Sequence, residues 1–331
     1  MAEFKEIIGH ESLIHHLQVA IRQDKVSHAY LFQGEALCGK KLVAQAFAKA
    51  LLCENEKGEA CGVCHSCKQA ESGNHPDIIR VIPSKETVLS VEDVRTQINA
   101  DISIKPYQSR YKIYLIADGD RMNEAAQNAL LKTMEEPPEY AVLVIMTTNA
   151  EHFLPTIRSR CVTLNFRWVS DGQIREYLMK QYQLTDYRAA EVVSFAQGNV
   201  GKAIMLASSS LFTDLRDRLL SCLRKISERN ILEISQETQE LMAIAEEKTV
   251  LLDMMTVWFR DVLLYKTTKN NRFLIFKDSE ADIKREAKRI SESGLAAIFE
   301  AIKQAKQRIK SNVSPQLTME VLFDTIRKQM I

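Results

Sequence analysis

Short apolar runs alternate with amphipathic stretches over the first half of the chain. The runs that predict strands are Tyr30–Phe32, Ile78–Ile82, Ile113–Ile116, Val142–Met146 and Val162–Phe166. Helices are expected around these strands at Glu11–Gln23, Lys41–Leu52, Val91–Ala100 and Asn123–Glu135. In the first of them, apolar residues recur at helical spacing. Such short runs are typical of parallel strands that are covered on both faces. The alternation therefore predicts an α/β domain with a mainly parallel sheet, ending near Arg167.

Strand signals nearly vanish after Arg167. Three short helices are predicted at Asp171–Gln181, Asp186–Ala196 and Gly201–Ala207. From Leu211 to the end the pattern is that of long amphipathic helices, with breaks near Asn270–Asn271 and Ser311–Pro315. We therefore expect three domains: an α/β domain at 1–167, an all-α lid at 168–208 and an all-α helical collar at 209–331.

The composition fits this picture. The chain has 331 residues, of which 46% are hydrophobic and 26% charged, as in a globular protein of two or three domains. No run approaches the roughly 18 apolar residues of a membrane-spanning helix, and the charged start MAEFKEIIGHESL is unlike a secretory signal. We therefore expect a cytoplasmic protein. A net charge of +1 is low for a protein that wraps DNA alone, so any DNA contact requires a local patch or a larger assembly.

A candidate phosphate-binding loop, GEALCGKK, joins a predicted strand to a predicted helix at residues 34–41. Gly34 and Gly39 allow backbone N–H groups to point inward, the helix N-terminus adds partial positive charge, and Lys40 can reach a phosphate. Lys41 stands where Ser or Thr usually holds Mg²⁺, and an ammonium group cannot ligate a cation. We interpret the loop as derived from a nucleotide site rather than as an ordinary glycine turn. The sequence leaves open whether ATP or ADP still binds there.

An acidic residue, Asp118, closely follows the third predicted strand. This is the place of the Walker B aspartate relative to a phosphate loop. Gly119 follows, whereas an active ATPase usually has a glutamate there to orient the attacking water. Asp118 is also compatible with a simple turn at a strand end.

Four cysteines, Cys53, Cys61, Cys64 and Cys67, lie within a short span directly after a predicted helix. Two successive C-x2-C steps and one preceding cysteine can close a tetrahedral shell of four sulfurs, which predicts a structural zinc module at 53–67. Free thiols or a redox pair are the alternatives. Four unliganded loop cysteines in a cytosolic chain would be liable to oxidation, which favours zinc.

Five segments together resemble one known family. They are Ile8–His10 with His28–Phe32, the phosphate loop, the four-cysteine insert, Asn128–Pro138 (NALLKTMEEPP) and Thr156–Cys161 (TIRSRC). These segments span roughly residues 8–166 and are similar to the bacterial clamp-loader subunits of DNA polymerase III, within the AAA+ class. The resemblance implies a RecA-like parallel sheet with a zinc-binding insert, followed by the lid and the collar.

The resemblance also implies roles for individual residues. Ser159, Arg160 and Cys161 match the family's SRC motif, whose arginine reaches the γ-phosphate of ATP held by a neighbouring subunit. Without the resemblance, Arg160 would be interpreted as an exposed arginine before a strand. Thr148 and Asn149 match the sensor 1 region, and are also compatible with turn residues at a strand end.

The family contains ATP-hydrolysing motor subunits and a member that does not hydrolyse ATP. Lys41, Gly119 and Gly201 each replace a different element of the phosphoryl-transfer site, Gly201 standing where motor subunits have the sensor 2 arginine. The intact Arg160 and the three losses favour the non-hydrolysing member, without independent catalytic activity.

The implied assembly is a hetero-oligomeric ring. Its implied partners are the delta subunit, the gamma/tau subunits, the sliding clamp (beta) and primer–template DNA, and no membrane is involved. Two alternatives are an active gamma/tau-type ATPase subunit and a zinc-dependent interaction module on an inactive nucleotide fold.

Overall fold

The computed structural model describes residues 3–85, 87–209, 212–244, 248–311 and 313–330. These residues form two compact units. Unit 1 comprises the described residues up to Tyr177 together with Gly198–Lys202, and unit 2 comprises Leu178–Gln197 and the described residues from Ala203 onward. The division passes through two helices, α7 (Asp171–Gln181) and α9 (Val200–Ser208). The expected domain boundaries at 167 and 208 stay predictions.

Unit 1 is built on a parallel sheet, as the sequence predicts. Its strands are β1 (Ala29–Gln33), β2 (Ile78–Val81), β3 (Lys112–Ile116), β4 (Ala141–Thr147) and β5 (Val162–Asn165). In the described part of the chain they form one sheet in the order β2-β3-β4-β1-β5, with every pair parallel. β3 and β4 are buried throughout, whereas β5 alternates between half-buried and exposed positions. The expectation that all five strands are covered on both faces was therefore wrong for the edge.

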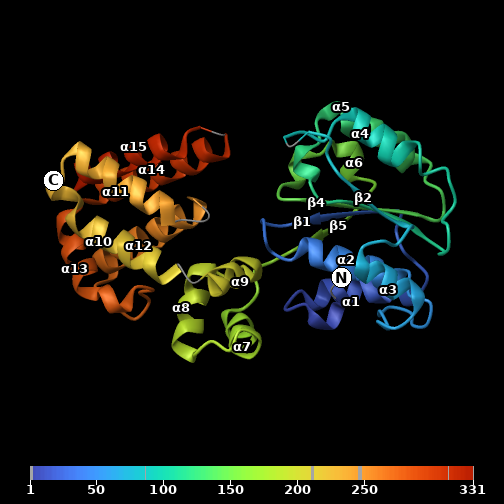
Figure 1. Cartoon of the computed structure of the whole chain (residues 1–331), viewed down its shortest axis with the longest axis horizontal. Helices are drawn as coiled ribbons and strands as arrows, with labels where there is room; N and C mark the ends of the chain where they lie inside the picture. Colours follow the sequence, from blue (N-terminus) through green and yellow to red (C-terminus); the bar gives the residue numbers. More distant parts are fainter. Residues whose placement is uncertain (1–2, 86, 210–211, 245–247, 312, 331) are drawn as a thin grey trace. The chain divides into compact units, whose positions relative to one another are not determined.

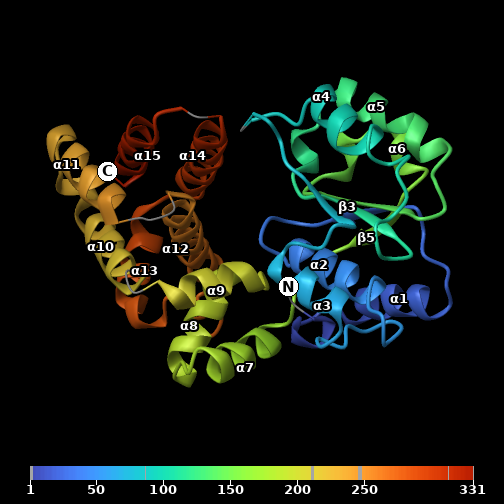
Figure 2. The ribbon, with the colours of Figure 1, turned by 45° about the vertical axis from the view of Figure 1, so that its right-hand side comes forward.

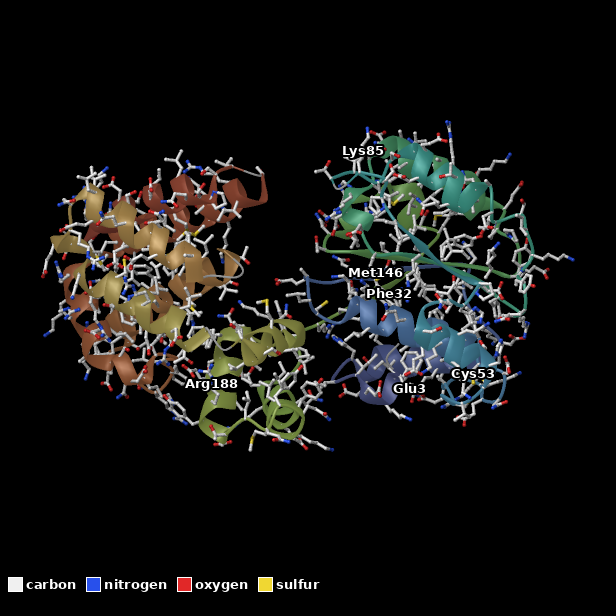
Figure 3. All side chains as sticks on the ribbon, in the orientation of Figure 1. Glu3, Phe32, Cys53, Lys85, Met146 and Arg188 are labelled. Atoms are coloured by element: carbon white, nitrogen blue, oxygen red, sulfur yellow. The ribbon has the colours of Figure 1, made fainter. Side chains whose placement is uncertain are left out.

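Helices cover both faces of this sheet (Figures 1 and 2). On one face lie α1 (Glu11–Arg22), α2 (Lys40–Leu51) and α3 (His65–Ser72); on the other lie α4 (Val91–Val94), α5 (Glu124–Glu135) and α6 (Pro155–Arg158). Each face has its own apolar core. Phe32 and Met146, paired in register on β1 and β4, belong to the core on the α1–α2 side (Figure 3).

Two helices of unit 1 were not predicted, and one expected helix is interrupted. α3 buries only small or polar side chains, Ser66, Cys67 and Ala70, so it carries no apolar periodicity. α6 is a four-residue helix with proline at its first position. The stretch expected as a helix from Val91 to Ala100 changes from α4 to a π-helical turn at Arg95–Asn99.

Unit 2 is all-α, as the sequence predicts. Its longer helices are α8 (Asp186–Ala196), α10 (Phe212–Lys225), α11 (Ile231–Ile244), α12 (Lys248–Thr268), α13 (Glu280–Arg289), α14 (Glu292–Lys310) and α15 (Pro315–Gln329). The end of α12 and the α14–α15 junction confirm the two expected breaks. Leu211, where the helical pattern was expected to begin, lies outside the described residues. No helix among the described residues is long and apolar enough to span a membrane.

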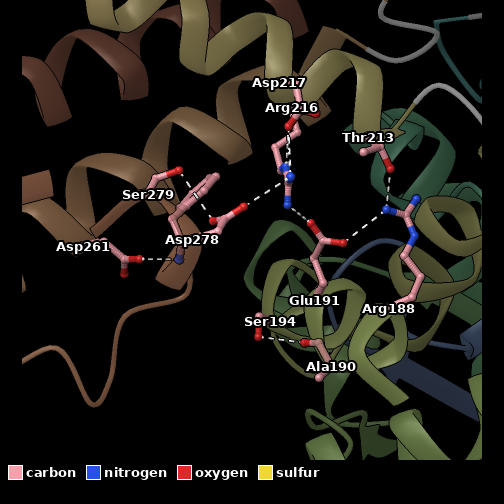
Figure 4. Close-up of polar contacts among 11 residues, drawn as sticks. Arg188, Ala190, Glu191, Ser194, Thr213, Arg216, Asp217, Asp261, Asp278 and Ser279 are labelled. Carbon is pink, nitrogen blue, oxygen red and sulfur yellow. Dashed lines mark hydrogen bonds and ion pairs between the residues drawn. The ribbon is translucent and has the colours of Figure 1, made fainter. Parts of the chain in front are cut away.

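Helix α8 is joined to the rest of unit 2 by charged and aromatic contacts. Glu191 accepts hydrogen bonds from Arg188 at 3.1 Å and from Arg216 of α10, and Arg216 also lies 3.3 Å from the Asp278 carboxylate (Figure 4). The Phe195 ring packs edge-on against Phe276 at 5.1 Å between centroids. Because α8 contributes to this shared cluster, it packs as a part of the helical unit.

Candidate functional site

The candidate phosphate loop connects β1 to α2. Gly39 precedes the helix with a φ of +97°, a left-handed conformation that glycine adopts without strain, and Lys40 is the first residue of α2. The Lys40 ammonium donates hydrogen bonds to two carbonyl oxygens of its own loop, those of Gly34 at 2.5 Å and Glu35 at 2.7 Å. Lys40 therefore points back over the loop, while Lys41 is exposed on α2.

The start of α9 packs directly on this loop. The Gly201 N–H donates to the Leu37 carbonyl oxygen at 3.0 Å, and the buried Asn199 side chain donates to the Ala36 carbonyl oxygen at 2.8 Å. A Cβ atom added to Gly201 would lie 2.4 Å from the Leu37 oxygen. Position 201 therefore has no room for a side chain unless the loop moves. Asn199 was not singled out from the sequence, although it belongs to the segment Gly198–Ala203 that resembles the start of the family's sensor 2 helix.

The candidate Walker B residue lies two positions after the end of β3. Asp118 is half-exposed, and its carboxylate lies 3.8 Å from the Arg121 guanidinium. Gly119 is buried, and a Cβ atom added there would lie 2.6 Å from the Met146 carbonyl oxygen of β4. A glutamate at this position would therefore require this turn or the neighbouring strand to shift.

The sensor 1 candidates are organised by an acidic residue that the sequence analysis missed. The Asp120 carboxylate accepts the Thr148 N–H at 2.8 and 3.0 Å and the Thr147 hydroxyl. The Asn149 side chain accepts the Glu151 N–H at 3.0 Å and so caps a short 3₁₀ turn. Asp120 follows Asp118 by two positions at a strand end, which was the available signal.

A cavity of about 220 Å³ adjoins the loop and is lined by Gly34, Cys38, Thr148, Phe166 and Trp168, among others. Sites that enclose small molecules usually have volumes of about 300–1,000 Å³. A Cβ atom on Gly34 would lie 2.7 Å from the Phe166 Cβ, so the loop is tightly packed on this side. The arrangement gathers Gly34, Cys38 and the sensor 1 candidate Thr148 around one cavity.

The four cysteines come together as predicted. Their sulfur atoms all lie within 4.8 Å of one another, close to the spacing of about 3.8 Å that a tetrahedral zinc site with Zn–S bonds near 2.3 Å requires. Cys53 follows α2 (Figure 3), Cys64 caps the N-terminus of α3, and Cys67 lies in its first turn. The expectation of four loop cysteines was therefore wrong for Cys67.

Backbone N–H groups surround these sulfurs. The N–H groups of Val63 and Cys64 lower the pKa of the Cys61 thiol to about 6, which favours a thiolate at neutral pH. Burial raises the pKa of the Cys67 thiol. Further N–H groups approach Cys53 and Cys64 at 3.3–3.5 Å. Such donors stabilise thiolate charge, so the cluster can hold a metal ion.

Arg160 lies between α6 and β5 with one third of its side chain exposed. Its guanidinium donates to the Glu135 carboxylate at 2.9 Å and to the Thr156 carbonyl oxygen at 2.9 Å. Ser159 donates to the same carbonyl oxygen at 3.1 Å. Burial raises the pKa of the Cys161 thiol to about 12, which suits a packing residue. The pairing with Glu135 was not predicted, although Glu135 belongs to a quoted motif.

A close relative decides the family. Over 307 residues the chain is 32% identical to the DNA polymerase III subunit delta-prime of Bacillus subtilis (strain 168), and 92% of each chain is covered. The chain belongs to the delta-prime family of DNA polymerase III clamp-loader subunits. This confirms the predicted resemblance.

Further comparisons match other subunits of DNA polymerase III. Family models described as "DNA polymerase III, delta subunit" and "DNA polymerase III, delta subunit, C terminal" match residues 9–170 and 210–325. The DNA polymerase III subunit tau of Bacillus subtilis (strain 168) is 28% identical over 342 residues, covering 96% of this chain and 60% of tau. The fold resembles that of a DNA polymerase III gamma subunit-related protein from Thermotoga maritima, with a TM-score of 0.51, 19% identity, and coverage of 96% of this chain and 99% of the other.

Proposed function

We propose that this chain is the non-hydrolysing delta-prime subunit of the DNA polymerase III clamp loader. In this function Arg160 serves as an arginine finger for ATP held by a neighbouring gamma/tau subunit. The assembled ring, which also contains the delta subunit, loads the sliding clamp onto primed DNA. The chain itself supplies a rigid nucleotide-type fold whose own site is silent.

The contact between Gly201 and the phosphate loop carries this proposal. A sensor 2 arginine at position 201 would need a Cβ atom 2.4 Å from the Leu37 carbonyl oxygen, so the phosphate loop would have to move to make room for it. At position 119, the Met146 carbonyl oxygen is in the way of a glutamate side chain. Both catalytic side chains would require the backbone around them to shift, so the backbone at these two positions is fitted to glycine. This supports a site that cannot hydrolyse ATP.

Arg160 has the properties that an arginine finger needs. Its guanidinium has five N–H donors, and Glu135 and Thr156 bind only one nitrogen each. One third of the side chain remains exposed. A planar, permanently charged group of this kind stabilises the negative charge that builds on a transferring phosphoryl group.

The four-cysteine cluster is the second part of the proposal. We assign it as a structural Zn²⁺ site with Cys53, Cys61, Cys64 and Cys67 as ligands. Four sulfurs leave no open coordination position, so the ion would fix the fold between α2 and α3 rather than take part in chemistry.

An active gamma/tau-type subunit is the alternative that the similarity to tau favours. The two readings differ in which residue controls turnover. The decisive experiment measures ATP hydrolysis by a reconstituted loader with clamp and primed DNA. It compares wild type, Arg160→Ala and Lys40→Ala, with Arg158→Ala as the matched control on the exposed surface of α6.

A sharp loss of turnover with Arg160→Ala and little change with Lys40→Ala is the expected result. If Lys40→Ala is instead the damaging substitution, this chain hydrolyses ATP and the proposal is wrong. If the purified chain does not enter the complex at all, the alternative of an unrelated interaction module gains support.

A further inference from the structure

The ion pair between Arg160 and Glu135 joins two elements of unit 1. Glu135 is the last residue of α5, and Arg160 follows α6. The Glu135 carboxylate accepts from the Arg160 Nη2 at 2.9 Å, while the Thr156 carbonyl oxygen accepts from Nη1 at 2.9 Å. Acceptors on two different nitrogens of one planar group restrict both its position and its orientation.

Glu135 stands at a place that helix electrostatics disfavour. A carboxylate in the last turn of a helix faces the partial negative charge of the helix C-terminus. Glu136, the adjacent carboxylate, is exposed as well. The positive charge that compensates Glu135 comes from Arg160, with which it forms an ion pair.

The pair contributes little to fold stability. Half of the Glu135 side chain and one third of the Arg160 side chain are exposed. Ion pairs with this exposure are screened by water and salt and are weak stabilisers. What the pair does change is the freedom of Arg160, because an unpaired arginine samples many rotamers that would be lost when it meets a phosphate.

We propose that Glu135 is a positioning residue for Arg160. It holds the guanidinium in place before the neighbouring subunit docks, so that the remaining N–H groups meet the γ-phosphate without a search for the right rotamer. This inference rests on the proposed arginine-finger function. Glu135 touches neither ATP nor the attacking water and acts only through Arg160.

The test uses the reconstituted loader with clamp, primed DNA and ATP, and separates kcat from KM. Glu135→Ala removes both the charge and the acceptor and is expected to lower kcat about three- to tenfold. The KM for ATP stays unchanged because the neighbour binds the nucleotide. Glu135→Gln keeps one acceptor oxygen and recovers part of the loss. Glu136→Ala is the matched control and is expected to resemble wild type, and all variants keep the thermal midpoint of the wild type.

The double variant separates positioning from other effects. In an Arg160→Ala background, Glu135→Ala is expected to cause no additional loss. An equal loss in both backgrounds would mean that Glu135 acts by another route, and the inference would be wrong. If Arg160→Ala reduces turnover but Glu135→Ala matches Glu136→Ala, the inference fails while the finger stands. If Arg160→Ala has no effect, both the proposed function and this inference are wrong.

Discussion

Gly201 and Leu37 meet through their backbones: the Gly201 N–H donates to the Leu37 carbonyl oxygen at 3.0 Å. Leu37 has a φ of +64°, a left-handed conformation that costs a non-glycine residue about 1–3 kcal/mol. Asn199 supports the neighbouring Ala36 carbonyl. The start of α9 thus holds the strained loop in place. A side chain added at Gly201 would disturb this contact directly.

Substituting Gly201 with alanine should destabilise the protein. The added Cβ atom would lie 2.4 Å from the Leu37 oxygen, so the loop or the helix start must shift. We expect the free energy of unfolding to fall by about 1–3 kcal/mol. Chemical denaturation of the purified chain measures this change.

Gly172 provides the matched control. It also lies within a helix, α7, but a Cβ atom added there meets nothing within 4 Å. Gly172→Ala should raise the free energy of unfolding by about 0.4–1 kcal/mol, because alanine restricts the unfolded chain. Equal tolerance of both substitutions would show that the Gly201 contact is not a tight one.

Removal of the proposed zinc ion should destabilise unit 1. The purified chain is expected to carry one zinc ion, measured by elemental analysis. Cys64→Ser should lose it, because the remaining three sulfurs cannot complete the tetrahedral shell. A loss of a few kcal/mol would lower the thermal midpoint by about 5–10 °C. Cys161→Ala should keep the zinc, and a zinc-free wild type with an unchanged midpoint under chelator would contradict the assignment.

Glu286 of α13 gives a pH-dependent prediction. Its side chain is buried, one carboxylate oxygen lacks a partner, and burial raises the pKa of the carboxyl group. Because the folded-state pKa exceeds the unfolded one, the folded state binds more protons between the two values. Wild type therefore loses stability as the pH rises through the folded-state pKa of Glu286.

Glu286→Gln removes that loss. The variant should be more stable than wild type at pH 8 by about 1 kcal/mol, and the gain should shrink as the pH falls toward 5. Thermal unfolding across this pH range measures it, with Glu300→Gln on the exposed face of α14 as control. A gain that is constant with pH would rule out titration of Glu286 as the cause.

The fold could largely be predicted because its core elements are strongly patterned. β3 and β4 are continuous apolar runs, and α1 has an apolar stripe at helical spacing. α3 was not predicted because its buried side chains, Ser66 and Cys67 among them, are not apolar enough to form a pattern. The partial exposure of β5 was not predicted because an edge position depends on strand order, which local sequence does not encode.

The candidate site was predicted where its chemistry is local. The cysteine cluster could be predicted from the spacing of the four cysteines, and the place of Lys40 from the loop that carries it. The contact of Gly201 with Leu37 and the pairing of Glu135 with Arg160 join residues that are distant in the sequence. The family resemblance singled out Gly201 and Arg160, but only the fold showed which atoms meet.

The strand order also governs how this chain must be made. β1 lies between β4 and β5, where Ala29 pairs with Leu143 and Tyr30 pairs with Val162. A ribosome that adds about 5–20 residues per second needs on the order of ten seconds to reach those partners. For that interval the apolar segment AYLFQ has two unpaired edges, which favours association with other chains. Slower synthesis lengthens this interval and should therefore lower the yield of folded protein. Chaperone binding to this early segment should raise it.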